Sequence, residues 1–199
     1  DRLPSVLHRS YFKARAVEER RRAQDGGLPL SQCLDAFARA EALGKDNTWT
    51  CDKCKHACVA QKTSSVWAAP DILVVHLSRF YYTTHSKEKV TAMVDFPLEG
   101  FDLAPWCAKR PGVADGAVPL DKHMYDLFAV VDHMGGMGGG HYTASVLNTG
   151  GAAPKWFRYN DSSVSALDPN HVVSKQAYIL FYRRRHLSPH NVINLTTPQ

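Results

Sequence analysis

The feature that most restricts the fold of this sequence is a series of short β-prone segments separated by turn residues. Residues 71–80 (DILVVHLSRF) hold a nearly continuous run of apolar and β-branched side chains after Pro70, which predicts a buried strand. Similar segments, which predict four further strands, span 125–133, 141–147, 156–160 and 177–184. Strands joined by tight turns after a helical beginning are typical of an α+β fold with a mainly antiparallel sheet.

Helices are expected only near the start of the sequence. Residues 9–23 predict a charged helix with a thin apolar side, and a second helix is expected from Ser31, a suitable N-cap, to Gly44. Residues 100–122 are rich in Gly, Pro and Ala without a clear period, so we expect a loop or insertion there. Two weaker β-prone runs, each expected to form a short strand, lie at 63–67 and 91–98.

Length and composition bound the class of protein. A chain of 199 residues, 44% of them hydrophobic, can bury one sizeable core. No apolar run reaches 18 residues, so we expect no transmembrane helix and no membrane partner. The first residues lack the apolar stretch of a secretory signal. Because the sequence does not begin with Met, we expect it to be a processed chain or a piece of a longer one.

The net charge of +5 is concentrated in one segment. Six Lys/Arg and two Glu lie between Arg9 and Arg22, which gives +4 there and leaves +1 for the rest of the sequence. The basic pI therefore does not indicate a nucleic-acid-binding face, and we expect no nucleic acid partner. For the basic segment itself, a solvated helix or linker is favoured over a specific anionic partner.

Five cysteines are present, an odd number that does not suit a disulfide framework. We therefore expect a reducing compartment, the cytoplasm or the nucleus. The pair Cys51-x-x-Cys54 has the spacing with which two thiolates bind one zinc ion. A structural zinc site needs four ligands, and the spacings of His56 and Cys58 suit the same site poorly. The sequence predicts half of a zinc site, and a cysteine-rich turn without metal remains the alternative.

Residues 134–146 (MGGMGGGHYTASV) place five glycines before a histidine. If 141–147 and 156–160 form a hairpin, His141 lies near Asn160 or Asp161, whose side-chain oxygen would hold one imidazole nitrogen and leave the other to accept a proton. Taken alone, this pattern favours a structural histidine at a strand end, because lone histidines are common. The sequence has no GxSxG motif, and none of its five cysteines has a convincing context for a nucleophile.

Several segments together resemble one protein family. DILVVHLSRF, VDFPLEGFDL, YDLFAVVDHMGGMGGGHYTASV, WFRYNDSSVSAL and AYILFYRR are similar, in this order, to the C-terminal half of the catalytic domain of ubiquitin-specific proteases. LPLSQCLDAFARAEAL and WTCDKCK are similar to the segment that leads into that half, so the resemblance runs from Leu28 to Arg184. It is greatest to the branch whose catalytic domain is split by a large insertion.

The resemblance implies a papain-like cysteine protease fold with thumb, palm and fingers. Residues 28–186 would be the C-terminal half of the catalytic domain, with part of the fingers at about 45–66 and the palm at about 67–186. Residues 1–27 would be a basic helical linker or the end of the insertion, and 187–199 a flexible tail.

The resemblance also implies roles for individual residues. His141 would be the general base, Asn160 the third member of the catalytic triad and Asp161 an auxiliary polar group. Cys51 and Cys54 would be the second pair of a zinc ribbon made from two CxxC motifs. The residues implied to bind the C-terminal tail of ubiquitin are Gly135, Gly136, Gly140 and Tyr142. Of the glycines, we expect Gly138 and Gly139 to form a flexible turn and Gly140 to allow close approach of backbone.

The implied function is hydrolysis of the isopeptide bond after the C-terminal glycine of ubiquitin. The sequence contains neither the cysteine box nor the first CxxC of that family. We therefore expect the nucleophile in an N-terminal half on another segment or chain, with ubiquitin and ubiquitylated proteins as the other partners. The alternative is a non-catalytic ubiquitin-binding or scaffold module.

Overall fold

The structure is a computed structural model that describes residues 27–44, 47–82, 87–109, 120–136, 138–151 and 153–185. The helix expected at 9–23 and the tail at 187–199 lie outside these residues. No helix in the described part of the chain is both long enough and apolar enough to cross a membrane.

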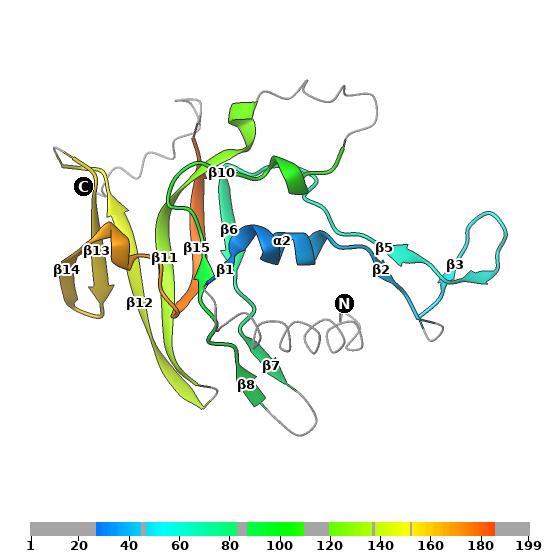
Figure 1. Ribbon diagram of the computed structural model, residues 1–199, viewed down its shortest axis with the longest axis horizontal. Coiled ribbons are helices and arrows are strands. Elements are labelled where there is room, and N and C mark those ends of the chain that lie inside the picture. The colour runs from blue at the N-terminus through cyan, green and yellow to red at the C-terminus, as the bar shows by residue number, and fades with distance from the viewer. Residues whose placement is uncertain are drawn as a thin grey trace, which may run out of the picture.

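The centre of the molecule is a seven-stranded antiparallel sheet (Figure 1). Six strands follow the order β14-β13-β12-β11-β15-β6, and β10 pairs with β11 at its start. The strands are β6 (Ile72–His76), β10 (Phe101–Asp102), β11 (Met124–Gly136), β12 (Gly139–Asn148), β13 (Lys155–Asn160), β14 (Ser163–Leu167) and β15 (Ala177–Arg184). This sheet confirms the predicted fold class and the strands within 125–133, 141–147, 156–160 and 177–184. The sequence reasoning did not predict β14.

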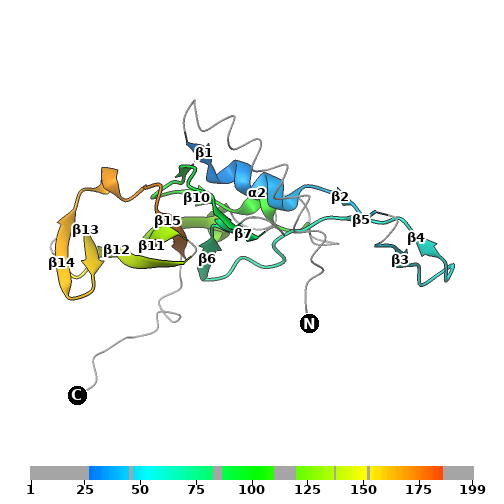
Figure 2. The ribbon, with the colours of Figure 1, turned by 90° about the horizontal axis from the view of Figure 1, so that it is seen from below.

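One face of the sheet carries the core. Tyr125, Leu127 and Val130 of β11 and Leu180 and Tyr182 of β15 are fully buried on this face. Helix α2 (Leu30–Ala38) lies along this side of the sheet (Figure 2) and contributes the buried Leu30. Burial of each large side chain is worth about 1.5–3 kcal/mol, so this face supplies most of the hydrophobic stabilisation.

The strand predicted within 71–80 forms, but the expectation that it is buried is wrong. The strand β6 covers only Ile72–His76 and forms one edge of the sheet. Its side chains alternate, because neighbouring residues of a strand point to opposite faces. Leu73 and Val75 pack against the core, whereas Ile72 and Val74 are 43% and 53% exposed. The continuous apolar run therefore belongs to a strand of which one face is open.

The second expected helix forms, but its ends differ from the prediction. Its N-cap is Pro29 without a side-chain cap, so Ser31 lies inside the first turn. It ends at Ala38, before Gly44, because Glu41–Ala42 form strand β2 and pair with Gln61–Lys62, strand β5. The strand β9 (Val94–Asp95) confirms a short strand within 91–98 and pairs in parallel with β1 (Leu28–Pro29). In the run 63–67 the structure shows a single bridge, from Val66 to Cys107.

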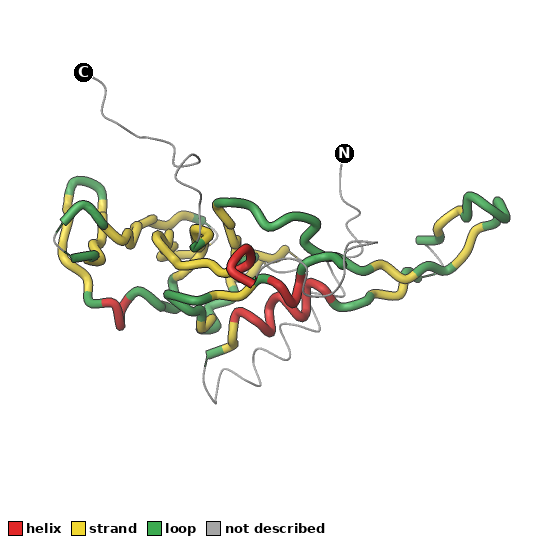
Figure 3. Tube along the Cα trace, turned by 90° about the horizontal axis from the view of Figure 1, so that it is seen from above, coloured by secondary structure: helices red, strands yellow, loops and turns green. Residues whose placement is uncertain are grey.

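Two short ribbons project from the body of the molecule. The pair β2–β5 leads into a second pair, β3 (Trp49–Thr50) and β4 (Ala57–Cys58). Figures 1 and 3 show them extending away from the sheet, with the Cys51–Cys54 turn at the far end. We call residues 41–62 the projecting arm. A third hairpin, β7 (Phe80–Tyr82) and β8 (Lys87–Lys89), lies beside the central sheet.

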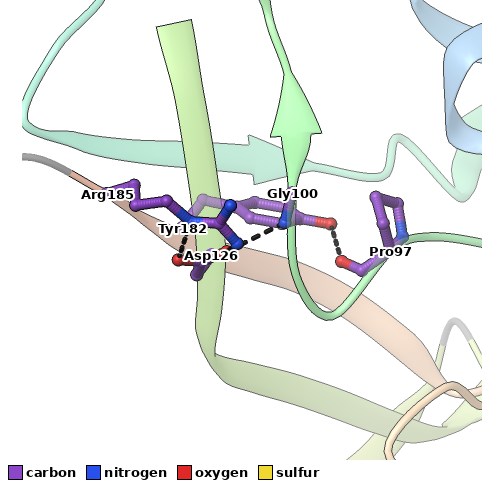
Figure 4. Close-up of polar contacts among 5 residues, drawn as sticks. All are labelled: Pro97, Gly100, Asp126, Tyr182 and Arg185. Atoms are coloured by element: carbon purple, nitrogen blue, oxygen red, sulfur yellow. Dashed lines mark hydrogen bonds and ion pairs between the residues drawn. The ribbon is translucent and has the colours of Figure 1, made fainter. Parts of the chain in front are cut away.

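The region expected as a loop at 100–122 is tied to the sheet at its beginning. It contains strand β10 and two short 3₁₀ helices, Ala104–Trp106 and Leu120–His123, while 110–119 lie outside the described residues. Asp126 accepts hydrogen bonds from the backbone N–H of Gly100 and from the guanidinium of Arg185 (Figure 4). Burial raises the pKa of Asp126, but these donors outweigh it and hold the pKa below its usual value. The hydroxyl of Tyr182 donates to the carbonyl of Pro97 at 2.9 Å.

Candidate active site

The glycines form the tip of a long hairpin. Strands β11 and β12 remain paired up to Gly135↔Gly140 and Gly136↔Gly139. A Cβ added at Gly138 or Gly139 would meet nothing within 4 Å, as a turn in open space requires. Gly138 lies in the turn, as expected, whereas Gly139 already begins strand β12 and pairs with Gly136 of β11.

Two of these glycines are required by the fold itself. Gly135 has a φ of +105°, and a Cβ there would lie 2.7 Å from the carbonyl oxygen of Gly139. A Cβ on Gly140 would overlap Nε2 of His133 and lie 2.5 Å from the carbonyl oxygen of Met134. The close approach expected at Gly140 therefore exists inside the protein, between the hairpin and the ring of His133.

His141 and Asn160 meet at one end of the neighbouring strands β12 and β13. The β12–β13 ladder runs from Asn148↔Lys155 to Ala144↔Tyr159, so the start of β12 lies beside the end of β13. Nε2 of His141 lies 2.5 Å from Oδ1 of Asn160. The proximity predicted from the hairpin is confirmed, and Asn160 is the direct partner.

Asp161 is the more distant of the two candidates. Its Oδ2 lies 3.9 Å from Nε2 of His141, and its side chain is 81% exposed, so water screens the interaction. Asp161 opens the two-residue turn between Asn160 and Ser163 and has a φ of +49°, which Asp tolerates better than most residues. Its backbone role in this turn is clearer than its electrostatic one.

The hydrogen bond to Asn160 decides the chemistry available to His141. The amide oxygen is an acceptor, so it assigns the proton of the neutral imidazole to Nε2. Nδ1 then carries the lone pair and is the atom that accepts a proton. The His141 side chain is 44% exposed, so this nitrogen is within reach of an incoming group. The geometry suits a general base with a neutral orienting partner.

A second histidine, His133, belongs to strand β11 of this hairpin, and the sequence reasoning missed it. His133 is only 4% exposed, and its ring contacts the rings of Phe80, Tyr142 and Tyr178 at centroid distances of 5.3, 4.6 and 5.9 Å. Burial, and then the charge of Lys89, lowers the pKa of His133. The signal in the sequence is the pair of histidines that bracket the glycines.

Tyr142 belongs to this aromatic cluster. It pairs with His133 across the β11–β12 ladder and packs against its ring. Because successive residues of a strand point to opposite faces, Tyr142 and His141 project to different sides of β12.

The candidate metal ligands lie at the end of the projecting arm. Backbone N–H groups of Cys54 and Lys53 donate to the sulfur of Cys51 and lower its pKa, as expected for a thiolate ready to bind a cation. The imidazole Nδ1 of His56 instead bonds the carbonyl of Cys54, and the thiol of Cys58 donates to the carbonyl of His56. Within the described ranges no three potential ligands come together. Zinc at Cys51 and Cys54 therefore stays a prediction that needs further ligands.

No disulfide joins the five cysteines, and in the described part of the chain none of them is a hydrogen-bond partner of His141. Cys33 packs from α2 against the core, and Cys107 donates from its thiol to the carbonyl of Leu103. Neither has the setting of an activated nucleophile.

Comparisons with known proteins agree with this arrangement. The family profile described as "Ubiquitin carboxyl-terminal hydrolase" matches residues 42–182, which is most of the chain. The chain belongs to this family. The resemblance to ubiquitin-specific proteases is thereby confirmed, and so is the papain-like fold.

The most similar relatives include Ubiquitin carboxyl-terminal hydrolase 10 of Arabidopsis thaliana, 37% identical over 92% of this chain and 18% of the relative. Ubiquitin carboxyl-terminal hydrolase 15 of Homo sapiens is 39% identical over 79% of this chain and 15% of the relative. The chain therefore spans less than a fifth of the length of these relatives.

Solved structures give the same result. The SAGA Ubp8/Sgf11/Sus1/Sgf73 DUB module bound to ubiquitin aldehyde has a chain with a TM-score of 0.67 and 33% identity, over 82% of this chain and 35% of that one. The module bound to monoubiquitin has a chain with a TM-score of 0.66 and 32% identity, over 83% of this chain and 34% of that one.

Proposed function

We propose that this chain is the C-terminal half of the catalytic domain of a deubiquitinating cysteine protease. It would act on the isopeptide bond after the C-terminal glycine of ubiquitin. The observation that carries the proposal is the hydrogen bond between His141 and Asn160, which orients a general base beside a glycine-lined hairpin in a member of this family. Similar chains in solved structures hold monoubiquitin or ubiquitin aldehyde, which supports ubiquitin as the ligand.

The nucleophile of this mechanism is a cysteine in an N-terminal half outside this chain. Nδ1 of His141 takes the proton of that thiol, and the thiolate attacks the carbonyl carbon of the terminal glycine. The collapse of the tetrahedral intermediate breaks the C–N bond, and the imidazolium gives its proton to the leaving lysine amine. A water, deprotonated by His141, then hydrolyses the thioester. Asn160 keeps the imidazole in one orientation and tautomer throughout.

The glycine hairpin is the proposed wall of the channel for the ubiquitin tail. Gly135, Gly136 and Gly140 present backbone rather than side chains, which lets the thin tail of ubiquitin lie close to His141. Tyr142, whose ring is tilted against that of His133, would contact the ubiquitin tail from the other side of β12. Asp161 is assigned an auxiliary role, because its negative charge would stabilise the imidazolium form of His141.

Zinc is proposed as a structural ion of the projecting arm. Cys51 and Cys54 would supply two thiolates, and a CxxC pair in the N-terminal half would supply the other two. When bound, the ion would supply a cross-link between the two halves and no chemistry in the cleavage.

The remaining assignments follow from the same proposal. The two halves would belong to a catalytic domain split by an insertion, of which residues 1–27 are the end. Ubiquitylated proteins are the substrates, and no nucleic acid or membrane partner is proposed. Cysteines that form no disulfide with one another are compatible with the cytoplasm or the nucleus.

A ubiquitin probe with an electrophilic C-terminus tests the proposal. We expect no labelling of this chain alone, and labelling of a cysteine of the N-terminal half when the two halves are combined. Labelling of Cys33, Cys58 or Cys107 would overturn the assignment of the nucleophile. A combined protein that binds ubiquitin tightly but is never labelled would instead be a non-catalytic binding module.

A further inference from the structure

One lysine lies at the outer edge of the glycine hairpin. Lys89 is the last residue of β8, where it pairs with Phe80 of β7. Its ammonium nitrogen Nζ donates hydrogen bonds of 2.8 Å to the carbonyl oxygens of His133 and Gly135. These residues lie 44 and 46 positions further along the sequence, so no local pattern indicates the contact.

The two carbonyl groups lie on a strand edge that has lost its partner strand. The ladder between β11 and β15 ends at Asp132↔Ala177, and the N–H of His133 makes one more bond, to the carbonyl of Gln176. Beyond this point β11 continues to Gly136, paired with β12. Carbonyl groups at an open edge need donors, and a lysine ammonium can supply several. Lys89 therefore takes the place of β15 along this stretch.

The position of these two carbonyl groups relates Lys89 to the candidate base. They belong to the residues on either side of Met134, and Met134 is the residue paired with His141 in the β11–β12 ladder. The hydrogen bonds on both sides of Met134 restrict the position and orientation of the β11 backbone at this residue. The ladder passes that constraint to His141, on the opposite strand.

Lys89 is itself held in place. Its Nζ lies 5.8 Å from the centroid of the Phe80 ring, a distance at which cation and ring attract each other. Arg79, which is 3% exposed, donates to the carbonyl of Ala177 at 2.7 Å and to that of Val90 at 3.0 Å, so it ties the end of β8 to the start of β15. Burial, and then the charge of Arg79, lowers the pKa of Lys89, and the charge-assisted bonds to two carbonyls offset this loss of hydration.

We propose that Lys89 is a positioning residue for His141, an inference that rests on the proposed function. It touches no reacting atom. Its ammonium group binds the two carbonyl groups at the open edge of β11. This contact keeps Nε2 of His141 hydrogen-bonded to Oδ1 of Asn160 and keeps Nδ1 in a fixed orientation. A base that is free to drift by about 1 Å loses a large part of its effect, up to about a hundredfold.

Three substitutions in the complete protease test this inference. Lys89→Met keeps the length of the side chain and removes its donors, Lys89→Arg keeps donors for both carbonyls, and Lys155→Met removes an exposed lysine of β13 as the matched control. The readouts are kcat and KM on ubiquitin with a fluorogenic C-terminal amide, and hydrogen–deuterium exchange of residues 133–142. We expect Lys89→Met to lower kcat about tenfold, with KM changed less than about twofold and with faster exchange at 133–142. Lys89→Arg should retain most of the kcat and most of the protection from exchange at 133–142. Lys155→Met should match the unmodified protein in both readouts.

Three outcomes would overturn the inference: an unchanged kcat in Lys89→Met, a lower kcat without faster exchange at 133–142, or equal losses in Lys89→Met and Lys89→Arg. Lys89→Leu is the second variant without donors, and the same outcomes apply to it if Lys89→Met does not fold. The proposed function is tested separately by His141→Ala. Cleavage by His141→Ala would overturn the proposed function, whereas an inactive His141→Ala with a normal Lys89→Met would overturn only the role of Lys89.

Discussion

The two candidate sites of this molecule differ in how complete they are. At the ends of β12 and β13, His141 has its partner Asn160 within the same chain, 2.5 Å away. At the end of the projecting arm, Cys51 and Cys54 stand together without a third ligand among the described residues. Both regions were expected from short motifs of similar length.

The difference has a structural cause. His141 and Asn160 are brought together by a ladder between strands that are neighbours in sequence, so the fold of this chain alone is sufficient. The arm consists of ribbons of two-residue strands, and a structural zinc site needs ligands on a second loop. The His141–Asn160 contact is therefore complete within this chain. A zinc site at Cys51 and Cys54 would need ligands from a second segment.

The largest expected effect is that of His141→Ala in the reconstituted protease. Removal of the base should lower kcat by about 10³–10⁴-fold, because the thiol then loses both its proton acceptor and its ion-pair partner. Ubiquitin binding, measured by titration, should stay within a few-fold of the unmodified protein. His171→Ala, at a 3₁₀ helix remote from this hydrogen bond, is the control. Substantial cleavage by His141→Ala would place the base elsewhere.

Substitution of Cys51 tests the other region. In the reconstituted protein, Cys51→Ser should lower the zinc content from about one ion per molecule to nearly none, because one of four thiolates is lost. Cys58→Ser should keep the metal, since its thiol bonds the carbonyl of His56 instead. Metal analysis after dialysis distinguishes the two. In this chain alone the metal content should be low, and a tight one-to-one ion there would mean that His56 or Cys58 is a ligand after all.

Asn160→Ala tests whether the partner of His141 matters. Loss of the orienting oxygen should lower kcat by about 10–100-fold, less than loss of the base, because the imidazole remains. Asn160→Asp should retain activity, since a carboxylate also accepts from Nε2. Asn170→Ala, in the 3₁₀ helix Pro169–His171, is a matched control. Equal activity of Asn160→Ala and the unmodified enzyme would show that this hydrogen bond does not contribute to catalysis.

Gly140→Ala tests the hairpin between the two histidines. The new methyl group would overlap the ring of His133 and the carbonyl of Met134, so we expect a loss of about 1–3 kcal/mol in the free energy of unfolding and a lower kcat. Gly139→Ala places its methyl group in open space and should change both far less. Chemical denaturation and steady-state kinetics measure the two effects. A stable Gly140→Ala with low turnover would show that the tail of ubiquitin, rather than His133, needs the space.

The smallest effect concerns His133 and pH. Burial lowers its pKa in the folded state, so the unfolded chain, with a histidine pKa of about 6.5, takes up the proton first. Stability is therefore fully present above about pH 6.5 and falls as the pH decreases below it. His133→Gln should show a shallower fall, by about 1 kcal/mol over the same range. Parallel denaturation curves at pH 7.5 and 5.5 measure this, and identical slopes in both proteins would contradict it.

Much of the sheet followed from the sequence because its strands are neighbours along the chain. The segments at 125–133, 141–147, 156–160 and 177–184 all form strands, and the predicted pairing of 141–147 with 156–160 is confirmed. The edge position of β6 could not be inferred, because a continuous apolar run has the same appearance whether one or both faces are covered. The early end of α2 was also missed, because Glu41–Ala42 pair with residues 20 positions away.

The sequence by itself determined the hairpin, the proximity of His141 to Asn160 and Asp161, and the cysteine pair of the arm, since each depends on residues close in the chain. Only the tertiary structure decided what surrounds them. It placed the ring of His133 against Gly140 and the ammonium of Lys89 on the open edge of β11. These contacts join segments that are distant in sequence, and their energy comes from burial and carbonyl pairing, for which no local pattern exists.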